Sequence, residues 1–174
     1  AVLEKGLRKE VSPERISYYL DFCSRTGEQP LGAGTLSGLI SQCPEKNRPG
    51  LLFKLAGLYI TSFGSPGRGW NMFRDIMKDP ETGLSRADSL YTFCNNHRYY
   101  IEGARILSFL VERAQKQERL AILSKMSALY RNAGETEKAL DRYEEITGMK
   151  PGEEKKEGKN MLKGIRRAQH YISS

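Results

Sequence analysis

The side chains with the clearest chemical potential in this sequence are cations. Residues 46–119 hold 12 Lys and Arg against 7 Asp and Glu, and residues 155–174 hold 6 against 1. Clustered cations of this kind bind a phosphate backbone or an acidic protein surface. The candidate contacts are Lys54, Arg68, Arg74, Arg98, Arg105, Arg113, Lys159, Lys163, Arg166 and Arg167. The alternative is a solvated, slightly basic surface, because the formal net charge is only +7.

Aromatic residues accompany some of these cations. Trp70, the only tryptophan, lies between Arg68 and Arg74 in the sequence. An exposed ring beside cations can stack on a nucleic-acid base. Packing at a junction between helices is the more usual role of a tryptophan, and it is the interpretation we favour. The pair Tyr99 and Tyr100 poses the same two alternatives, with core packing again favoured.

Patterns typical of catalysis or metal binding do not occur in the sequence. His97 and His170 lie far apart, without a carboxylate at ligand spacing, so we predict neither a metal site nor an enzyme. The glycine-rich stretch 64–69 lacks the closing Gly-Lys-Ser/Thr of a phosphate loop and lies between two predicted helices. We interpret it as a turn and expect no cofactor.

The cysteines and the hydropathy pattern bear on the compartment. Cys23, Cys43 and Cys94 are odd in number and widely spaced, which argues against a disulfide framework. We expect reduced thiols that fill the core of an intracellular protein. There is no run of about 18 apolar residues, so no membrane span is predicted. Because the chain starts without a Met or a signal core, we expect either a fragment or a chain whose targeting segment was removed.

A period of 35 residues predicts the elements that position these side chains. Small residues recur at this spacing near the start of amphipathic segments, and leucines keep the same spacing one helix upstream. The two series are Gly34, Gly69, Ala104 and Ala139, and Leu20, Leu55 and Leu90. A small residue lets two helix backbones approach closely where they cross. We therefore expect an all-α, right-handed α-solenoid of about four helical hairpins with a C-terminal capping helix.

Apolar residues spaced by three and four give the helix boundaries. The predicted helices are 16–25, 33–43, 51–63, 69–78, 87–97, 102–115, 118–132, 137–147 and 159–172. We interpret Pro80 and Gly83 as breaks before the third hairpin. Residues 1–151 then form the repeat array, starting with the end of an earlier repeat. Residues 152–158 form a charged linker, and residues 159–174 form a basic amphipathic helix that covers the open end of the array.

Two stretches resemble known helical-repeat families. The fourth hairpin resembles the tetratricopeptide pattern of large, small, aromatic and turn positions. The matching residues are Leu123, Met126, Ser127, Tyr130, Gly134, Ala139, Tyr143 and Pro151. Residues 12–18, Ser-Pro-Glu-Arg-Ile-Ser-Tyr, resemble the Pro-Asp-x-x-Thr-Tyr helix entry of the pentatricopeptide family, whose repeat has 35 residues, and residues 3–7 look like the tail of an earlier repeat.

The pentatricopeptide resemblance implies that single-stranded RNA is bound in an organelle, with the mitochondrial matrix as the expected compartment, and that each repeat reads one base. By position, the reading pairs are Tyr19 with Pro49, Lys54 with Leu84, Ser89 with Arg119, and Ser124 with Glu154. Only Ser89 and Ser124 are small hydrogen-bonding residues of the kind the family uses. We therefore expect contact with the RNA backbone rather than a base code.

The tetratricopeptide resemblance implies a different function, a scaffold that binds a peptide or an acidic protein partner. The net negative charge of residues 120–154, with 5 Lys and Arg against 7 Asp and Glu, favours this alternative. A third alternative is a structural surface within a larger complex. A titration with single-stranded RNA over a salt series separates the RNA hypothesis from the scaffold hypothesis.

Overall fold

The computed structural model describes residues 11–28, 31 and 33–147, and within these residues the chain is helical and contains no strand. The all-α prediction is confirmed for this part. Its elements are α2 (Pro13–Thr26), α3 (Ala33–Ser41), the 3₁₀ turn η1 (Glu45–Asn47), α4 (Arg48–Thr61), α5 (Pro66–Lys78), α6 (Pro80–Asn96), α7 (Tyr100–Val111), α8 (Lys116–Asn132) and α9 (Thr136–Thr147). The predicted linker 152–158, the predicted helix 159–174 and its four candidate cations lie outside the described residues.

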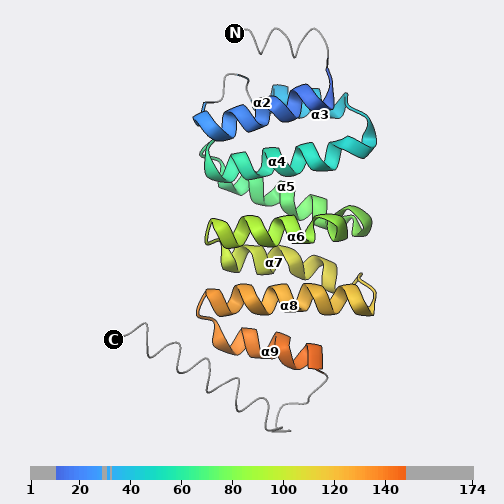
Figure 1. Ribbon diagram of the computed structural model, residues 1–174, viewed down its shortest axis with the longest axis vertical. Helices are drawn as coiled ribbons and strands as arrows, with labels where there is room; N and C mark the ends of the chain where they lie inside the picture. Colours follow the sequence, from blue (N-terminus) through green and yellow to red (C-terminus); the bar gives the residue numbers. More distant parts are fainter. Residues whose placement is uncertain (1–10, 29–30, 32, 148–174) are drawn as a thin grey trace, which may run out of the picture.

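The helices follow one another along the long axis in chain order (Figure 1). α2, α4, α6 and α8 lie roughly parallel across the molecule, with α3, α5 and α7 behind them, and we call these four the first-helix layer. Each helix packs on the next one, most extensively in the pairs α4 with α5, α7 with α8, and α8 with α9. Contacts also join α2 with α4, α5 with α7, and α6 with α8. Neighbouring hairpins therefore pack on each other, with α5 joining the second hairpin to both helices of the third.

The apolar core confirms the leucine series. Leu20 is 1% exposed, and Leu55 and Leu90 are fully buried. The buried side chains form two groups, one centred on α2, α3 and α4 and the other on α4 to α8. Leu52 and Met72 pack against both groups, so the core is continuous from α2 to α8.

The series of small residues has different causes at different positions. Ala104 is fully buried and Gly69 is buried, and a Cβ atom added to Gly69 would lie 2.5 Å from the carbonyl oxygen of Ala56. This close approach of α5 to α4 is the reason we gave for the series. At Gly34 the explanation is wrong, because that residue is exposed and an added Cβ atom would meet nothing within 4 Å.

The predicted break before the third hairpin is confirmed at Pro80, since α5 ends at Lys78 and α6 begins at Pro80, but it is wrong at Gly83, which is helical. The carboxylate of Asp79 accepts a hydrogen bond from the backbone N–H of Thr82 at 3.0 Å and caps the helix. Hydrogen bonds from the Thr82 side chain and backbone also lower the pKa of Asp79. Proline is well suited to the first position of a helix, where its missing N–H would have no intrahelical partner. Gly83 lies inside α6, where an added Cβ atom would lie 2.5 Å from Cδ2 of Leu110.

The turn predicted for residues 64–69 is shorter than expected. Gly64 has a φ angle of +62° and belongs to the turn, but α5 begins at Pro66, so Gly67, Arg68 and Gly69 are helical. Gly134, which lies between α8 and α9, has a φ angle of +78°. This is the left-handed conformation that glycine commonly adopts where a helix ends.

Candidate functional site

A groove crosses the first-helix layer between α2, α4 and α6. It consists of two hollows, of about 510 and 370 Å³, which share Phe53 and Lys54 of α4. The larger one is also lined by Lys46, Asn47 and Arg86, and we call it the basic hollow. The smaller one lies along the C-terminal halves of the same helices and is lined by Phe53, Phe93 and His97, and we call it the aromatic hollow. Cations and aromatic rings therefore line two adjoining hollows, together with the acidic residues Glu14 and Asp21.

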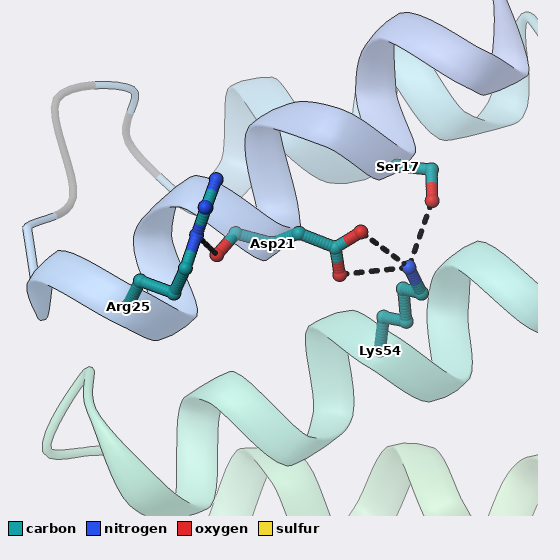
Figure 2. Close-up of polar contacts among 4 residues, drawn as sticks. All are labelled: Ser17, Asp21, Arg25 and Lys54. Atoms are coloured by element: carbon teal, nitrogen blue, oxygen red, sulfur yellow. Dashed lines mark hydrogen bonds and ion pairs between the residues drawn. The ribbon is translucent and has the colours of Figure 1, made fainter.

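Lys54 is held by the neighbouring helix (Figure 2). Its ammonium nitrogen lies 2.8 and 2.9 Å from the carboxylate oxygens of Asp21 and donates to the hydroxyl of Ser17 at 2.8 Å. Arg25 donates to the backbone carbonyl of Asp21 at 3.3 Å, which helps to fix that residue. The charge of Lys54 is thus compensated within the protein, which weakens its expected role as a phosphate contact.

Similar contacts link α6 with α8. The ammonium nitrogen of Lys125 lies 2.9 Å from the carboxylate of Asp88, and Asn132 donates a side-chain hydrogen bond to Asn95 at 2.9 Å. Ser89 lines the basic hollow, whereas Ser124 is exposed on α8 and lines neither hollow. The two serines that the resemblance implied as reading residues are therefore not brought together in the groove.

Arg86 is a groove residue that the sequence reasoning missed. Its Nε atom is buried and has no hydrogen-bond partner among the described residues. Arg86 stands 35 residues after Leu51 and 70 after Ile16, which are both buried. The available signal was an arginine at a position where the two preceding hairpins have a buried aliphatic residue.

The other predicted cations of the described part lie away from the groove. Arg68 lies 4.7 Å from the centre of the Tyr59 ring, Arg74 is 3.8 Å from the carboxylate of Asp75, and Arg113 donates to the carbonyl of Lys78. Arg98 and Arg105 are exposed at the α6–α7 turn and on α7. The described ranges contain 18 Lys and Arg against 16 Asp and Glu, so their surface is nearly balanced in charge.

Trp70 is partly buried and packs against the core, as favoured from the sequence. The centre of its ring system lies 5.4 Å from that of Tyr99, 5.8 Å from that of Phe73 and 6.5 Å from that of Phe93. Phe73, which is fully buried, lies behind the groove and contacts both Phe53 and Phe93, with ring centres 4.7 and 5.3 Å away. These rings support the two aromatic residues that face the groove.

The three cysteines are free and buried, as expected. Burial raises the pKa of Cys94 to about 12, and it also raises the pKa values of Cys23 and Cys43. Because the thiolate is the reactive form, we expect Cys94 in the native protein to react at pH 8 about 10³-fold more slowly than an exposed thiol. A disulfide reagent that releases a coloured thiol measures this rate with and without guanidinium chloride. A rapid reaction of all three thiols in the native protein would contradict the packing described above.

Metal sites and membrane spans are the other features to consider in the part of the chain that the structure describes. No three His, Cys, Asp or Glu side chains gather there as a possible metal site. None of the described helices combines the length and the apolar character needed to cross a bilayer. In comparisons with known proteins, no family model, curated protein or solved structure matches this chain.

Proposed function

We propose that this chain is a non-enzymatic helical-repeat module of the pentatricopeptide type, a right-handed α-solenoid that binds single-stranded RNA along the groove of the first-helix layer. The packing of successive hairpins and the polar contacts between residues 33 to 37 apart, such as Lys54 with Asp21 and Lys125 with Asp88, support the repeat. An organelle such as the mitochondrion is the proposed compartment.

The combination of Arg86 with Phe53 and Phe93 in one groove is the observation that carries the proposal. A single strand offers phosphates to cations and unpaired bases to aromatic rings, and proteins that bind it without a strict code use both contacts. A double helix presents its bases already stacked, so it would leave the aromatic hollow unused.

The competing proposal is a scaffold for an acidic peptide, and the near balance of charge in the described residues favours it over a long polyanion contact. Fluorescence anisotropy with a labelled 12-nucleotide RNA of mixed sequence separates the two. We expect binding that weakens about twentyfold between 50 and 200 mM salt, as for contact with roughly three phosphates. Unlabelled double-stranded RNA and poly-glutamate should compete poorly. Competition by poly-glutamate equal to that by single-stranded RNA would support the scaffold, and absence of binding at 50 mM salt would contradict the RNA proposal.

A variant in which Lys159, Lys163, Arg166 and Arg167 are all replaced by glutamine tests whether the groove is the binding site. If it is, this variant keeps measurable affinity and loses only part of the salt dependence. If binding disappears, the C-terminal cations are the site and the groove proposal is wrong. The thermal unfolding curve of the variant shows whether the substitutions disturb the fold.

A further inference from the structure

We propose that the basic hollow is a phosphate-binding pocket in which Arg86 makes the principal contact. This inference rests on the proposed function only in so far as RNA is one source of phosphate. Arg86 is half-buried, and its Nε atom is fully covered without a hydrogen-bond partner in the described ranges. A charge removed from water is costly unless an opposite charge or a set of hydrogen bonds compensates it. A bound anion would provide that compensation.

Two lysines of the first-helix layer have the carboxylate partner that Arg86 lacks. Lys54 is paired with Asp21 and Lys125 with Asp88. Among the other described arginines, Arg98, Arg105 and Arg131 are exposed to water, and half-buried Arg48 donates to the carbonyl of Cys43. The Nε atoms of Arg74 and Arg142 are also covered without a hydrogen-bond partner, but each of these arginines is paired with a carboxylate. Arg86 therefore combines a covered Nε atom with a charge that has no carboxylate partner in the described ranges, and it does so beside a hollow of about 510 Å³.

The position of the guanidinium group also points to an anion. A Cβ atom added to Gly50 would lie 2.9 Å from Nη2 of Arg86, so the guanidinium group lies against the first turn of α4. The N-terminus of a helix carries partial positive charge, and the first turn of α4 contains no acidic residue. Two positive groups placed this closely repel each other, and an anion that contacts both would relieve the repulsion.

Other groups in the hollow complete the donor set. Lys46 lies on η1, and the side chain of Asn47 lines the hollow without making a capping hydrogen bond to α4. A guanidinium fork, an ammonium group and an amide match the several acceptor oxygens of a phosphate group. Glu14 of α2 is the acidic residue in the lining, and it leaves a positive balance because Lys46 and Arg86 oppose it and Lys54 is paired elsewhere.

The volume of the hollow exceeds that of a phosphate ion and falls in the range of small-ligand sites. The apolar side chains of Leu51 and Phe53 beside the cations leave room for a base or a sugar next to the phosphate. The shared chemistry is a phosphate ester, which an RNA backbone or a terminal phosphate can supply. The two sources are distinguished by comparing RNA of one sequence with a 5′-phosphate and with a 5′-hydroxyl group.

The test uses the full chain and four proteins: wild type, Arg86→Gln, Gly50→Ala and Arg105→Gln. Each is titrated with inorganic phosphate by calorimetry and with the two RNAs by anisotropy. We expect Arg86→Gln to weaken phosphate and RNA binding about tenfold, as for the loss of one charge-assisted contact. Gly50→Ala should weaken binding severalfold, because the added methyl group displaces Nη2. Arg105→Gln is the matched control and should stay within twofold of wild type, since Arg105 is exposed and outside the groove.

The outcomes separate this inference from the proposed function. If wild type binds RNA and Arg86→Gln binds it equally well, the pocket is wrong and the RNA proposal stands. If inorganic phosphate binds in an Arg86-dependent way but RNA does not, the pocket stands and the RNA proposal is wrong. Without ligand, Arg86→Gln should unfold at the same temperature as wild type or higher, because it removes an uncompensated charge. A clear loss of thermal stability would assign Arg86 a structural role and overturn the inference.

Discussion

Replacing Gly69 by alanine should destabilise the protein by about 2 kcal/mol, although alanine is the better helix former by about 1 kcal/mol. The added Cβ atom would lie 2.5 Å from the carbonyl oxygen of Ala56 and 2.6 Å from Cγ1 of Ile60. The carbonyl belongs to the backbone of α4, so it cannot move aside as a flexible side chain could. The two helices of this hairpin would have to separate. Urea unfolding followed by circular dichroism measures the change in the free energy of unfolding.

Gly34→Ala is the matched control, because Gly34 has the equivalent position in the preceding hairpin. An added Cβ atom there meets nothing within 4 Å, so the substitution should stabilise the protein by up to about 1 kcal/mol through helix propensity. Equal gains of stability in the two variants would show that the α4–α5 contact is not as close as described. Changes of opposite sign in the free energy of unfolding would confirm that Gly34 and Gly69 have different packing environments, although they are equivalent in sequence spacing.

The hairpins could be predicted from the sequence because the positions that decide them are local. Apolar residues three and four apart fix the buried face of each helix, and Leu20, Leu55 and Leu90 are all buried as that pattern requires. Helix boundaries were predicted wrongly where a residue has a different effect at the end of a helix than in its interior. Pro66 and Pro80 begin helices, whereas proline in the interior of a helix would break it.

The groove could be predicted only in part, because its properties depend on contacts between repeats. Lys54 was a candidate as a free cation, but its partner Asp21 precedes it by 33 residues. Arg86 was not a candidate, because neither its burial nor its lack of a partner can be read from neighbouring residues. Ion pairs between hairpins reduce the uncompensated charge on the surface. A count of Lys and Arg along the chain does not detect these pairs.

The aromatic hollow also depends on a side chain that does not line it. Phe73 of α5 is fully buried, and its ring contacts Phe53 of α4, Phe93 of α6 and Trp70 of α5. Phe53 and Phe93 face the groove from two different helices of the first-helix layer. Phe73, on the second helix of its hairpin, therefore helps to determine the shape of the aromatic hollow.

Phe73→Ala should lower the free energy of unfolding by about 3–5 kcal/mol, because it removes a buried ring and leaves a cavity between three other rings. Phe109→Ala is the matched control, since the side chain of Phe109 on α7 is 39% exposed, and we expect it to cost less than about 1 kcal/mol. Urea unfolding at one temperature compares both variants with wild type. Similar losses for the two phenylalanines would contradict the central position given to Phe73.

Phe73→Leu keeps the test informative if the alanine variant does not fold, because leucine retains part of the buried volume. This variant should remain folded at low temperature, with a smaller loss of stability. If the aromatic hollow binds bases, its affinity for single-stranded RNA should also fall, because Phe53 and Phe93 lose the ring that supports them. A folded Phe73→Leu protein with unchanged RNA affinity would place the bases elsewhere. Whatever the RNA affinity, phosphate binding at Arg86 in the basic hollow should be the same in this variant as in wild type.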